Sequence, residues 1–448
     1  MSASDQRPDV IIIGAGAAGL AAARKLCGAG HHVLILEARD RIGGRIHTIH
    51  PSGWPLPIEL GAEFIHGMPP QTWEIVHAAA LSAYDVSDTH WWFANGKAQR
   101  MDDAWDKLRQ VMGRLDQLRD RDMSFAQFIK EHAADVEPRV RELALSFVEG
   151  FDAADTDLIS AQSIKDEQGA SSEEHGERNF RIVGGYQRLI DWLHAGLDPQ
   201  LARIRLGAIV THVRWKRGSV EVQIKSASDA VTEIFHAPHA LITVPLGVLK
   251  AQPKENGAIK FEPGLTSKHE AIKGLEMGPI VKCLLLFREP FWEQDDLPIL
   301  SKGQILKDAS FFHSHDPRYL TWWTALPMRV PMLTAWSGGP AAARMSGQSK
   351  EQLIEAAINT LSRLLGLSTE KIQSQLQAAN VYDWKADPFA RGAYSYLAVN
   401  GGDAHKRLSE PIEATLFFAG EATHDGQAGT VDGAIASGYR AAEEMLKV

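Results

Sequence analysis

The sequence predicts an α/β fold in which segments from both ends of the chain contribute to one parallel sheet. Near the start, residues 10–37 read VIIIGAGAAGLAAARKLCGAGHHVLILE, the pattern of a strand, a glycine turn, a helix and a second strand. Near the finish, residues 416–436 read LFFAGEATHDGQAGTVDGAIA, which predicts another strand and a helix that opens near Thr430. Glycines between a strand and a helix leave backbone N–H groups free to bind phosphate. We therefore expect both ends of the chain to meet at one dinucleotide.

The first segment fits the G-x-G-x-x-G pattern of a Rossmann-type βαβ unit. Gly14 permits the tight turn, Gly16 lets the backbone approach a pyrophosphate, and Gly19 lets the helix pack closely on the sheet. Glu37 ends the second strand, 18 residues beyond Gly19, where a carboxylate can bind a ribose diol. The pattern does not distinguish NAD from FAD.

A second pair of glycines follows this unit, in the run Arg39-Asp40-Arg41-Ile42-Gly43-Gly44-Arg45. Backbone and guanidinium groups of such a run can reach another part of the pyrophosphate, although a solvated basic turn has the same composition. The run EARDRIGGR after a βαβ unit resembles the FAD-binding amine oxidases, a family of monoamine oxidases, polyamine oxidases and lysine-specific histone demethylases.

The resemblance continues in family order along most of the chain, through LGAEFIHG (60–67), AIV (208–210), LITVPLGVLK (241–250), VKCLLLFREPFW (281–292), WKADPFARGAYSY (384–396), FAGEATH (418–424) and GTVDGA (429–434). It implies that FAD is the cofactor. It also implies that binding is non-covalent, because Ala393 stands where monoamine oxidases carry the cysteine that bonds to the flavin. The implied cofactor-binding residues are Gly14, Gly16, Ala18, Gly19, Glu37, Ala38, Arg39, Gly43, Gly44, Arg45, Gly61, Ala62, Glu63, Phe64, Val210, Trp384, Gly420, Glu421, Gly429, Thr430, Val431 and Ala434.

Four residues are implied to be catalytic. Lys282 matches the family's flavin-facing lysine, and a lysine between apolar strand residues needs a polar partner unless it reaches solvent at an edge. The helix opening near Thr430 would direct its N-terminus at the flavin and stabilise negative charge there. Tyr394 matches one of the two aromatic residues that flank the substrate in monoamine oxidases, and Thr430 replaces the other. His66 matches the histidine of animal and fungal polyamine oxidases.

The implied reaction is oxidation of an amine to an imine, which water converts to an aldehyde and an amine, with O2 reduced to H2O2. His66 and Thr430 favour polyamines, whose second ammonium group could meet Glu63, Asp425 or Glu421. Other primary or secondary amines are the alternative.

Two further alternatives are weaker. An L-amino-acid oxidase needs a cation for the substrate carboxylate, and such enzymes resemble GAMR where this chain has GAEF at 61–64. A non-enzymatic flavoprotein scaffold would need an inserted arm, and the sequence between Phe287 and Trp384 suggests none.

At 448 residues the chain predicts two domains. We expect a discontinuous FAD-binding domain (1–68, 178–270 and 385–448) and an α+β substrate-binding domain (69–177 and 271–384), with a polar loop at Asp166–Glu177.

The net charge of −9 without a basic cluster argues against a nucleic acid partner. The absence of a signal peptide and of a run of ~20 apolar residues predicts a cytoplasmic protein without a membrane partner, monomeric or homodimeric. Cys27 and Cys283 are expected to be buried thiols.

Overall fold

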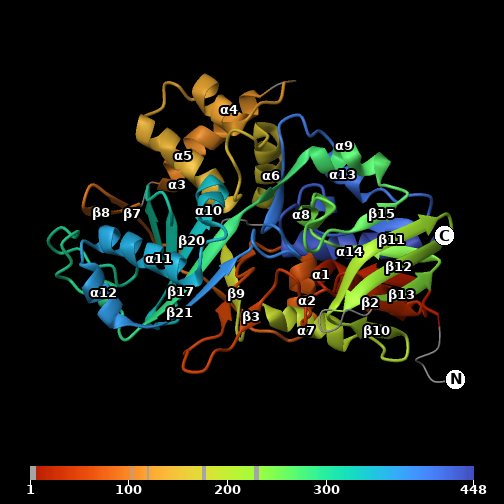
Figure 1. Ribbon diagram of the computed structural model, residues 1–448. Coiled ribbons are helices and arrows are strands. Elements are labelled where there is room, and N and C mark those ends of the chain that lie inside the picture. Colours follow the sequence, from red (N-terminus) through yellow and green to blue (C-terminus); the bar gives the residue numbers. More distant parts are fainter. Residues whose placement is uncertain (1–6, 102–103, 119–120, 174–177, 227–231) are drawn as a thin grey trace.

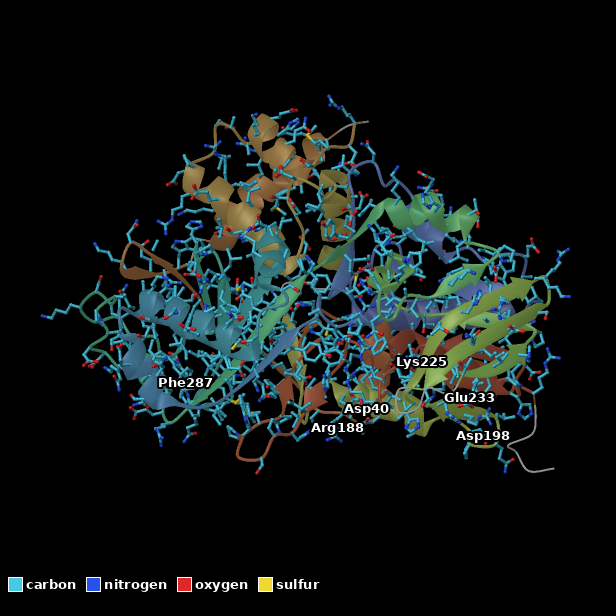
Figure 2. All side chains as sticks on the ribbon, in the orientation of Figure 1. Asp40, Arg188, Asp198, Lys225, Glu233 and Phe287 are labelled. Atoms are coloured by element: carbon cyan, nitrogen blue, oxygen red, sulfur yellow. The ribbon has the colours of Figure 1, made fainter. Side chains whose placement is uncertain are left out.

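The structure is a computed structural model that describes residues 7–101, 104–118, 121–173, 178–226 and 232–448. In the view of Figure 1, a lobe on the right holds a parallel sheet and a lobe on the left holds a larger mixed sheet. Helices from the first half of the chain lie above the junction of the lobes. Exposed charged side chains such as Lys225 and Asp198 lie on the outside of the right lobe, whereas Phe287 is fully buried in the left one (Figure 2).

The parallel sheet joins strands that are far apart in the sequence. Its spatial order is β10 (Ala202–Arg205), β2 (Val33–Leu36), β1 (Val10–Ile13), β14 (His239–Ile242) and β23 (Leu416–Phe418). β1 and β2 are apolar at every position because both faces of the sheet are covered. All five strands come from the three stretches predicted for the FAD domain, and they bring both ends of the chain into one sheet.

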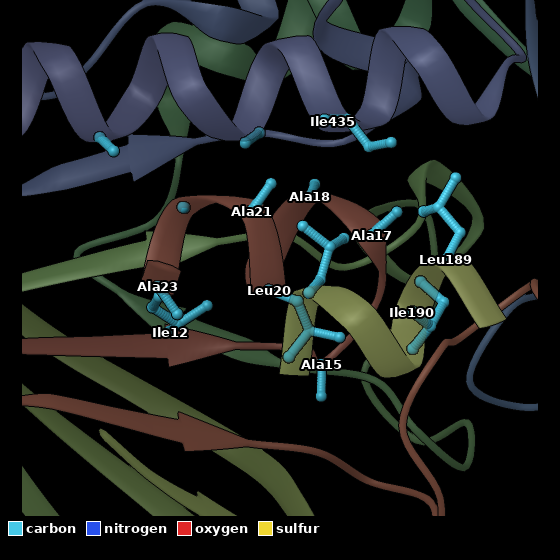
Figure 3. Packing of buried hydrophobic residues seen from close by; sticks show 14 of the residues in the cluster. Ile12, Ala15, Ala17, Ala18, Leu20, Ala21, Ala23, Leu189, Ile190 and Ile435 are labelled. Atoms are coloured by element: carbon cyan, nitrogen blue, oxygen red, sulfur yellow. The ribbon is translucent and has the colours of Figure 1, made fainter. Parts of the chain in front are cut away.

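Helices cover one face of this sheet, and a second sheet covers the other. On the helical face, α1 (Ala17–Gly28) packs between α14 (Val431–Met445) and α7 (Gln187–Ala195), and its alanines let the helices approach closely (Figure 3). A Cβ at Gly438 of α14 would lie 2.3 Å from the carbonyl oxygen of Ala18, so this contact requires glycine. The covering sheet has the order β13 (Thr232–Ala237), β12 (Ser219–Ser226), β11 (Ala208–Lys216) and β15 (Lys260–Glu262).

The left lobe is built on a seven-stranded sheet, with the order β21 (Leu376–Asp383), β17 (Ile280–Phe287), β20 (Met332–Gly338), β19 (Thr321–Thr324), β18 (Phe311–Ser314), β7 (His90–Ala94) and β8 (Lys97–Arg100). Alternate residues of β17, such as Cys283, pack with α10 (Gly339–Met345), α11 (Lys350–Leu365) and α12 (Thr369–Gln375). Lys282 therefore points to the opposite face, where its register partner on β20 is Trp336.

The helices above the two lobes are α3 (Ala104–Met112), α4 (Phe125–His132), α5 (Pro138–Phe151) and α6 (Ala161–Glu173). The prediction of a loop at Asp166–Glu177 is wrong for residues 166–173, which belong to α6. Ile164, in the same helix, is buried and packs on this helical cluster. Residues 174–177 lie outside the described residues.

Smaller elements connect the lobes. Two short sheets have the orders β5 (Ile65–His66), β9 (Asn179–Ile182), β6 (Ala83–Asp85) and β16 (Leu275–Gly278), β22 (Tyr394–Leu397), and β3 (Thr48–Ile49) pairs with β4 (Ile58–Glu59). The short helices are α2 (Pro70–Ala78), α8 (Leu246–Leu249), α9 (His269–Lys273) and α13 (Ala404–Ser409). Cys27 and Cys283 are buried free thiols, as predicted. Among the described residues, no helix has both the length and the apolar character needed to cross a membrane.

Candidate active site

The glycine turn after β1 shows why each of its glycines is needed. Gly14 has a φ of +113° and donates its N–H to the carbonyl of Leu36 at 2.8 Å. A Cβ at Gly19 would lie 2.1 Å from the carbonyl oxygen of Gly14, so a side chain there would separate helix from strand. At Gly16, the N-cap of α1, no protein atom lies within 4 Å of an added Cβ. The backbone at Gly16 therefore faces open space beside a helix N-terminus, which fits a bound pyrophosphate.

Substitution of two of these glycines separates cofactor binding from folding. Gly16→Ala should leave the free energy of unfolding of the FAD-free protein unchanged, while FAD affinity falls because the methyl group fills the open space. Gly19→Ala should destabilise the fold by about 3 kcal/mol through overpacking. Chemical denaturation of FAD-free protein and fluorescence titration with FAD measure the two effects. Unchanged FAD affinity in Gly16→Ala would contradict this placement of the pyrophosphate.

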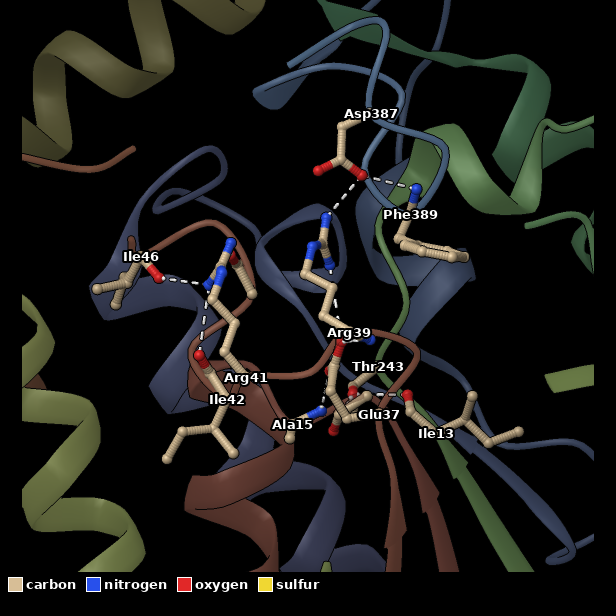
Figure 4. A network of polar contacts seen from close by, with 12 residues as sticks. Ile13, Ala15, Glu37, Arg39, Arg41, Ile42, Ile46, Thr243, Asp387 and Phe389 are labelled. Carbon is tan, nitrogen blue, oxygen red and sulfur yellow. Dashed lines mark hydrogen bonds and ion pairs between the residues drawn. The ribbon is translucent and has the colours of Figure 1, made fainter. Parts of the chain in front are cut away.

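The acid at the end of β2 is fixed beside the glycine turn. Glu37 is buried, and its two oxygens accept the N–H groups of Ala15 at 2.8 Å and Arg39 at 3.0 Å (Figure 4). The guanidinium of Arg39 donates to Asp387 at 2.8 Å, which ties this loop to the W-x-x-D-P segment. Arg41 donates to the carbonyls of residues 42, 44 and 46. These two arginines therefore hold the loop together, and the backbone of Gly43 and Gly44 lies nearer the glycine turn, where Gly43 bridges to Gly16.

The two ends of the chain are joined by a partly buried ion pair. Arg45 donates to Glu421 at 2.7 Å and to the carbonyl of Ala393 at 2.7 Å. Glu421 also accepts the hydroxyl of Ser395 at 2.6 Å and the N–H of Gly429 at 3.0 Å. Burial raises the pKa of Glu421, but Arg45 and these hydrogen bonds outweigh burial and hold that pKa below its usual range. Both carboxylate oxygens of Glu421 are thus engaged by protein donors.

A cavity lies at the carboxyl ends of β14 and β23, where open parallel sheets bind ligands. Its lining includes Arg45, Gly420 and Glu421, three of the predicted cofactor-binding residues. Gly420 has a φ of +129°, and an added Cβ there would meet no protein atom within 4 Å. Gly16 and Gly420 thus both leave open space beside their backbones, and both belong to segments predicted to bind FAD.

Lys282 has the polar partner that the sequence predicted. Its side chain is only 1% exposed, and its Nζ donates to Glu63 at 2.6 Å and to the carbonyl of Gly61 at 3.3 Å. The alternative of an edge lysine reaching solvent is therefore wrong. Glu63 is also 2.6 Å from a guanidinium nitrogen of Arg181 and accepts the indole N–H of Trp323 at 3.1 Å. Glu63 is thus engaged by protein cations, while Asp425 is exposed to solvent.

Aromatic side chains gather beside Lys282. Phe64 contacts Trp323 and His66, with ring centroids 5.5 and 6.0 Å apart, and His66 lies 5.2 Å from the ring of Phe151. The hydroxyl of Tyr394 donates to the carbonyl of Phe151, and the Nδ1 of His66 is 2.6 Å from the Oδ1 of Asn179. The ring of Phe151 is 51% exposed, so this aromatic group opens to solvent.

The helix predicted near Thr430 begins at Val431, with Thr430 as its N-cap. The hydroxyl of Thr430 accepts the N–H of Gly433 at 2.9 Å and donates to the carbonyl of Gln427 at 2.8 Å, so it serves the helix itself. A Cβ on Gly429 would lie 3.5 Å from the ring of Tyr394. The N-terminus of α14 and the ring of Tyr394 therefore lie next to each other.

The remaining predicted residues support these groups. Gly61 must be glycine, because an added Cβ would lie 1.8 Å from the carbonyl oxygen of Arg45. Trp384 is buried against Gly61 and donates its indole N–H to the carbonyl of Leu60 at 2.9 Å. Val210 is buried beside the end of β2. The other small residues occupy the helix starts and loop backbones around these groups: Ala18, Ala38, Ala62, Val431 and Ala434.

Sequence reasoning missed three residues of this site. Arg181, Asp387 and Ser395 hold Glu63, Arg39 and Glu421, respectively. Each lies far along the chain from the group that it binds, so no local spacing could reveal the pairing. The one available indication was general: buried carboxylates and guanidinium groups need partners of opposite charge.

Comparison with known proteins places this geometry in a family. The profile of the family described as flavin containing amine oxidoreductase matches residues 17–446. Polyamine oxidase 3 of Oryza sativa subsp. japonica is 31% identical, and the alignment covers 98% of this chain and 89% of the rice protein. Lysine-specific histone demethylase 2 of Homo sapiens is 29% identical over 97% of this chain and 53% of the human protein.

Solved structures share the fold. A putrescine oxidase bound to putrescine superposes with a TM-score of 0.78 over 99% of this chain and 100% of that chain, at 20% sequence identity. Cyclohexylamine oxidase from Brevibacterium oxydans also gives a TM-score of 0.78, at 20% identity over 99% of both chains. With the profile match over nearly the whole length, the chain therefore belongs to the family of flavin-containing amine oxidoreductases, FAD-dependent enzymes that oxidise amines.

Proposed function

We propose that this FAD-dependent amine oxidase acts on a polyamine such as spermidine or spermine and passes the electrons to O2, releasing H2O2. The observation that carries the substrate class is a pair of carboxyl groups: Asp152 directly follows the exposed Phe151, and its charge acts on both Tyr394 and Glu167. The relatives named polyamine oxidases support the same class. Bound FAD supplies the two-electron acceptor for the C–N bond.

The aromatic group suits the methylene chain of such a substrate. Phe64, Phe151, Tyr394 and Trp323 offer apolar ring surface, which binds alkyl segments without a specific hydrogen bond. We assign to Tyr394 and His66 the contact with the substrate, and to the N-terminus of α14 at Thr430 the stabilisation of negative charge during reduction of the cofactor.

Among the residues that the structure describes, no cationic side chain forms an ion pair with either carboxyl group. Asp152 ends helix α5 directly after Phe151, and its negative charge acts on both Tyr394 and Glu167. Burial raises the pKa of Asp152 towards neutrality, and burial together with the charge of Asp152 does the same for Glu167. A substrate ammonium group would stabilise both carboxylates, since a partly buried anion gains from a cationic partner.

A peroxide-coupled screen over spermine, spermidine, putrescine, tyramine and leucine tests the proposal. We expect the highest kcat/KM with spermidine or spermine. Equal or higher kcat/KM with tyramine would favour the alternative of a monoamine oxidase. A leucine-specific enzyme would instead need a free cation, and Arg181 is already paired with Glu63 at 2.6 Å.

Neutralising the carboxyl groups should weaken binding of polyamines selectively. Asp152→Asn with Glu167→Gln should raise KM for spermidine by about tenfold, the equivalent of one charge-assisted hydrogen bond, and leave KM for tyramine unchanged. Because both carboxyl pKa values are raised, the wild-type KM for spermidine should fall as the pH rises through neutrality, and this dependence should vanish in the variant. Asp425→Asn, at an exposed carboxylate, is the matched control and should change neither KM.

The domain limits, the monomeric or homodimeric state and the cytoplasmic location stay predictions of the sequence. Supporting the domain division, the strands of the seven-stranded sheet all fall within residues 69–177 and 271–384. Two strand pairs still cross between the proposed domains. β9 of the FAD-binding domain pairs with β6 of the substrate-binding domain, and β22 of the FAD-binding domain pairs with β16 of the substrate-binding domain. Size-exclusion chromatography with light scattering measures the oligomeric state.

A further inference from the structure

Glu63 lies between two buried cations in the candidate active site. One carboxylate oxygen, Oε2, accepts from the ammonium group of Lys282 at 2.6 Å. The other, Oε1, is 2.6 Å from the Nη2 of Arg181 and accepts the indole N–H of Trp323 at 3.1 Å. The exposed fractions of the three ionic side chains are 1% for Lys282, 9% for Arg181 and 11% for Glu63. Both oxygens of the carboxylate are thus held from opposite sides.

The contacts of Lys282 define the direction of its ammonium group. Its two oxygen acceptors, the Glu63 carboxylate and the Gly61 carbonyl, belong to one short segment. An ammonium group has three N–H donors, so these acceptors leave one N–H without an oxygen or nitrogen partner in the described part of the chain. The ring of Trp323 lies to the side, with its centroid 5.4 Å from the Nζ. Glu63 provides the shorter of the two hydrogen bonds and is the only residue in the described part of the chain that forms an ion pair with Lys282.

Arg181 in turn prevents Glu63 from turning away. Its guanidinium stacks on Phe64, 4.6 Å from the ring centroid, and lies 3.4 Å from the carbonyl oxygens of Thr324 and Leu326. Burial raises the pKa of Glu63, but Lys282 and Arg181 outweigh burial and hold that pKa below its usual range. The three groups carry a net charge of +1, which the Glu63 carboxylate makes tolerable by separating the two cations.

We propose that Glu63 is the positioning residue of Lys282: it fixes the direction of the ammonium group and leaves one N–H for the reaction at the flavin. This inference rests on the proposed amine oxidation. Glu63 itself has both oxygens occupied by protein donors, so its contribution to turnover is made through Lys282. Arg181 keeps the carboxylate in place and keeps the cluster cationic.

A set of charge-matched variants tests direction separately from charge. Glu63→Gln should lower kcat by about tenfold to a hundredfold, as expected for misplacement of a reacting group, with little change in KM. Arg181→Gln removes a neighbour of the same carboxylate that is equally close but keeps the Lys282–Glu63 pair, so its kcat should fall less than that of Glu63→Gln. The double variant Glu63→Gln, Arg181→Gln restores the wild-type net charge of +1, and its kcat should remain low.

The midpoint potential of the bound flavin provides a second readout that needs no substrate. Reduction adds negative charge to the flavin, so the potential should rise in Glu63→Gln, fall in Arg181→Gln and return to the wild-type value in the double variant. The double variant also avoids the fold instability that two unpaired cations would cause in Glu63→Gln.

Specific outcomes would overturn the inference. Recovery of kcat in the double variant would mean that charge and not direction matters, and an equal loss of kcat in Arg181→Gln would mean that Glu63 is only structural. Glu63→Gln should also lower kcat no further in a Lys282→Met background; independent, multiplying losses would show that Glu63 does not act through Lys282. If the wild-type enzyme oxidised no amine but the potentials followed this order, the proposed function would have failed and the cluster would still lie at the flavin. Midpoint potentials that did not change with the net charge of the cluster would show that the cluster does not lie near the flavin.

Discussion

Lys282→Met should lower kcat for amine oxidation by about a hundredfold while the purified protein keeps its bound FAD. Methionine matches the length of the lysine stem and suits its surroundings, since every residue of β17 is buried. Glu63 retains Arg181 at 2.6 Å and Trp323 at 3.1 Å, so the substitution leaves no unpaired carboxylate. The variant therefore removes the ammonium group of Lys282, while the carboxylate of Glu63 keeps a cationic partner. Turnover is measured by peroxide release, and FAD content by the visible absorbance of the protein.

A second buried lysine provides the control for this variant. The side chain of Lys268 is as buried as that of Lys282, and its Nζ donates to the carbonyls of Arg407 and Glu410 beside the ring of Phe418. Lys268→Met should reduce the free energy of unfolding, because it leaves carbonyl groups without their donor, but should not change kcat. Wild-type turnover in Lys282→Met, or an equal loss in both variants, would remove Lys282 from the reaction.

The parts of the fold that follow from local pattern could be predicted from the sequence. The glycines at 14 and 19 and the apolar strands on either side of them require a βαβ unit, and the structure has it at those residues. The N-cap at Thr430 was likewise predictable, because a threonine before a helical apolar pattern satisfies a free N–H group. The polar partner of Lys282 followed from the cost of burying a charge.

The partners themselves could not be predicted, because side-chain pairing depends on how distant segments meet. Asp387 binds Arg39 across a sequence separation of 348 residues, and Glu421 binds Arg45 across 376. Composition misled at α6, where a polar stretch suggested a loop but the structure continues the helix that begins with the buried Ala161 and Ile164. Because this stretch was predicted to be a loop, Glu167 was not predicted to be a binding residue. Glu63 and Glu421 illustrate the same limit. Either carboxylate could bind a substrate cation, but in the structure each forms an ion pair with a protein cation, Lys282 or Arg45, respectively.

Glu421→Gln should destabilise the protein by about 3 kcal/mol and cause loss of FAD. The glutamine amide would place an N–H₂ group against donors that now bind the carboxylate, and it would leave the partly buried Arg45 without an anion. Since the pKa of Glu421 is held below its usual range, the carboxylate stabilises the fold at neutral pH and this contribution is lost as the pH falls below about 4. The variant should therefore show a flatter dependence of stability on pH in acid than the wild type. Chemical denaturation at several pH values and the ratio of flavin to protein measure both effects.

The control is Glu443→Gln, at an ion pair with Lys25 in which the glutamate side chain is 54% exposed. Solvent screens such a pair, so stability and FAD content should not change. The contrast between the two glutamates decides what the buried pair does. Arg45 and Glu421 come from opposite ends of the chain, and the hydrogen bonds of Glu421 hold Gly429 at the entrance of α14. If Glu421→Gln kept both wild-type stability and bound FAD, the closure of the two termini would depend on the strands of the parallel sheet alone. Loss of FAD without loss of stability would instead assign the pair to the cofactor and not to the fold.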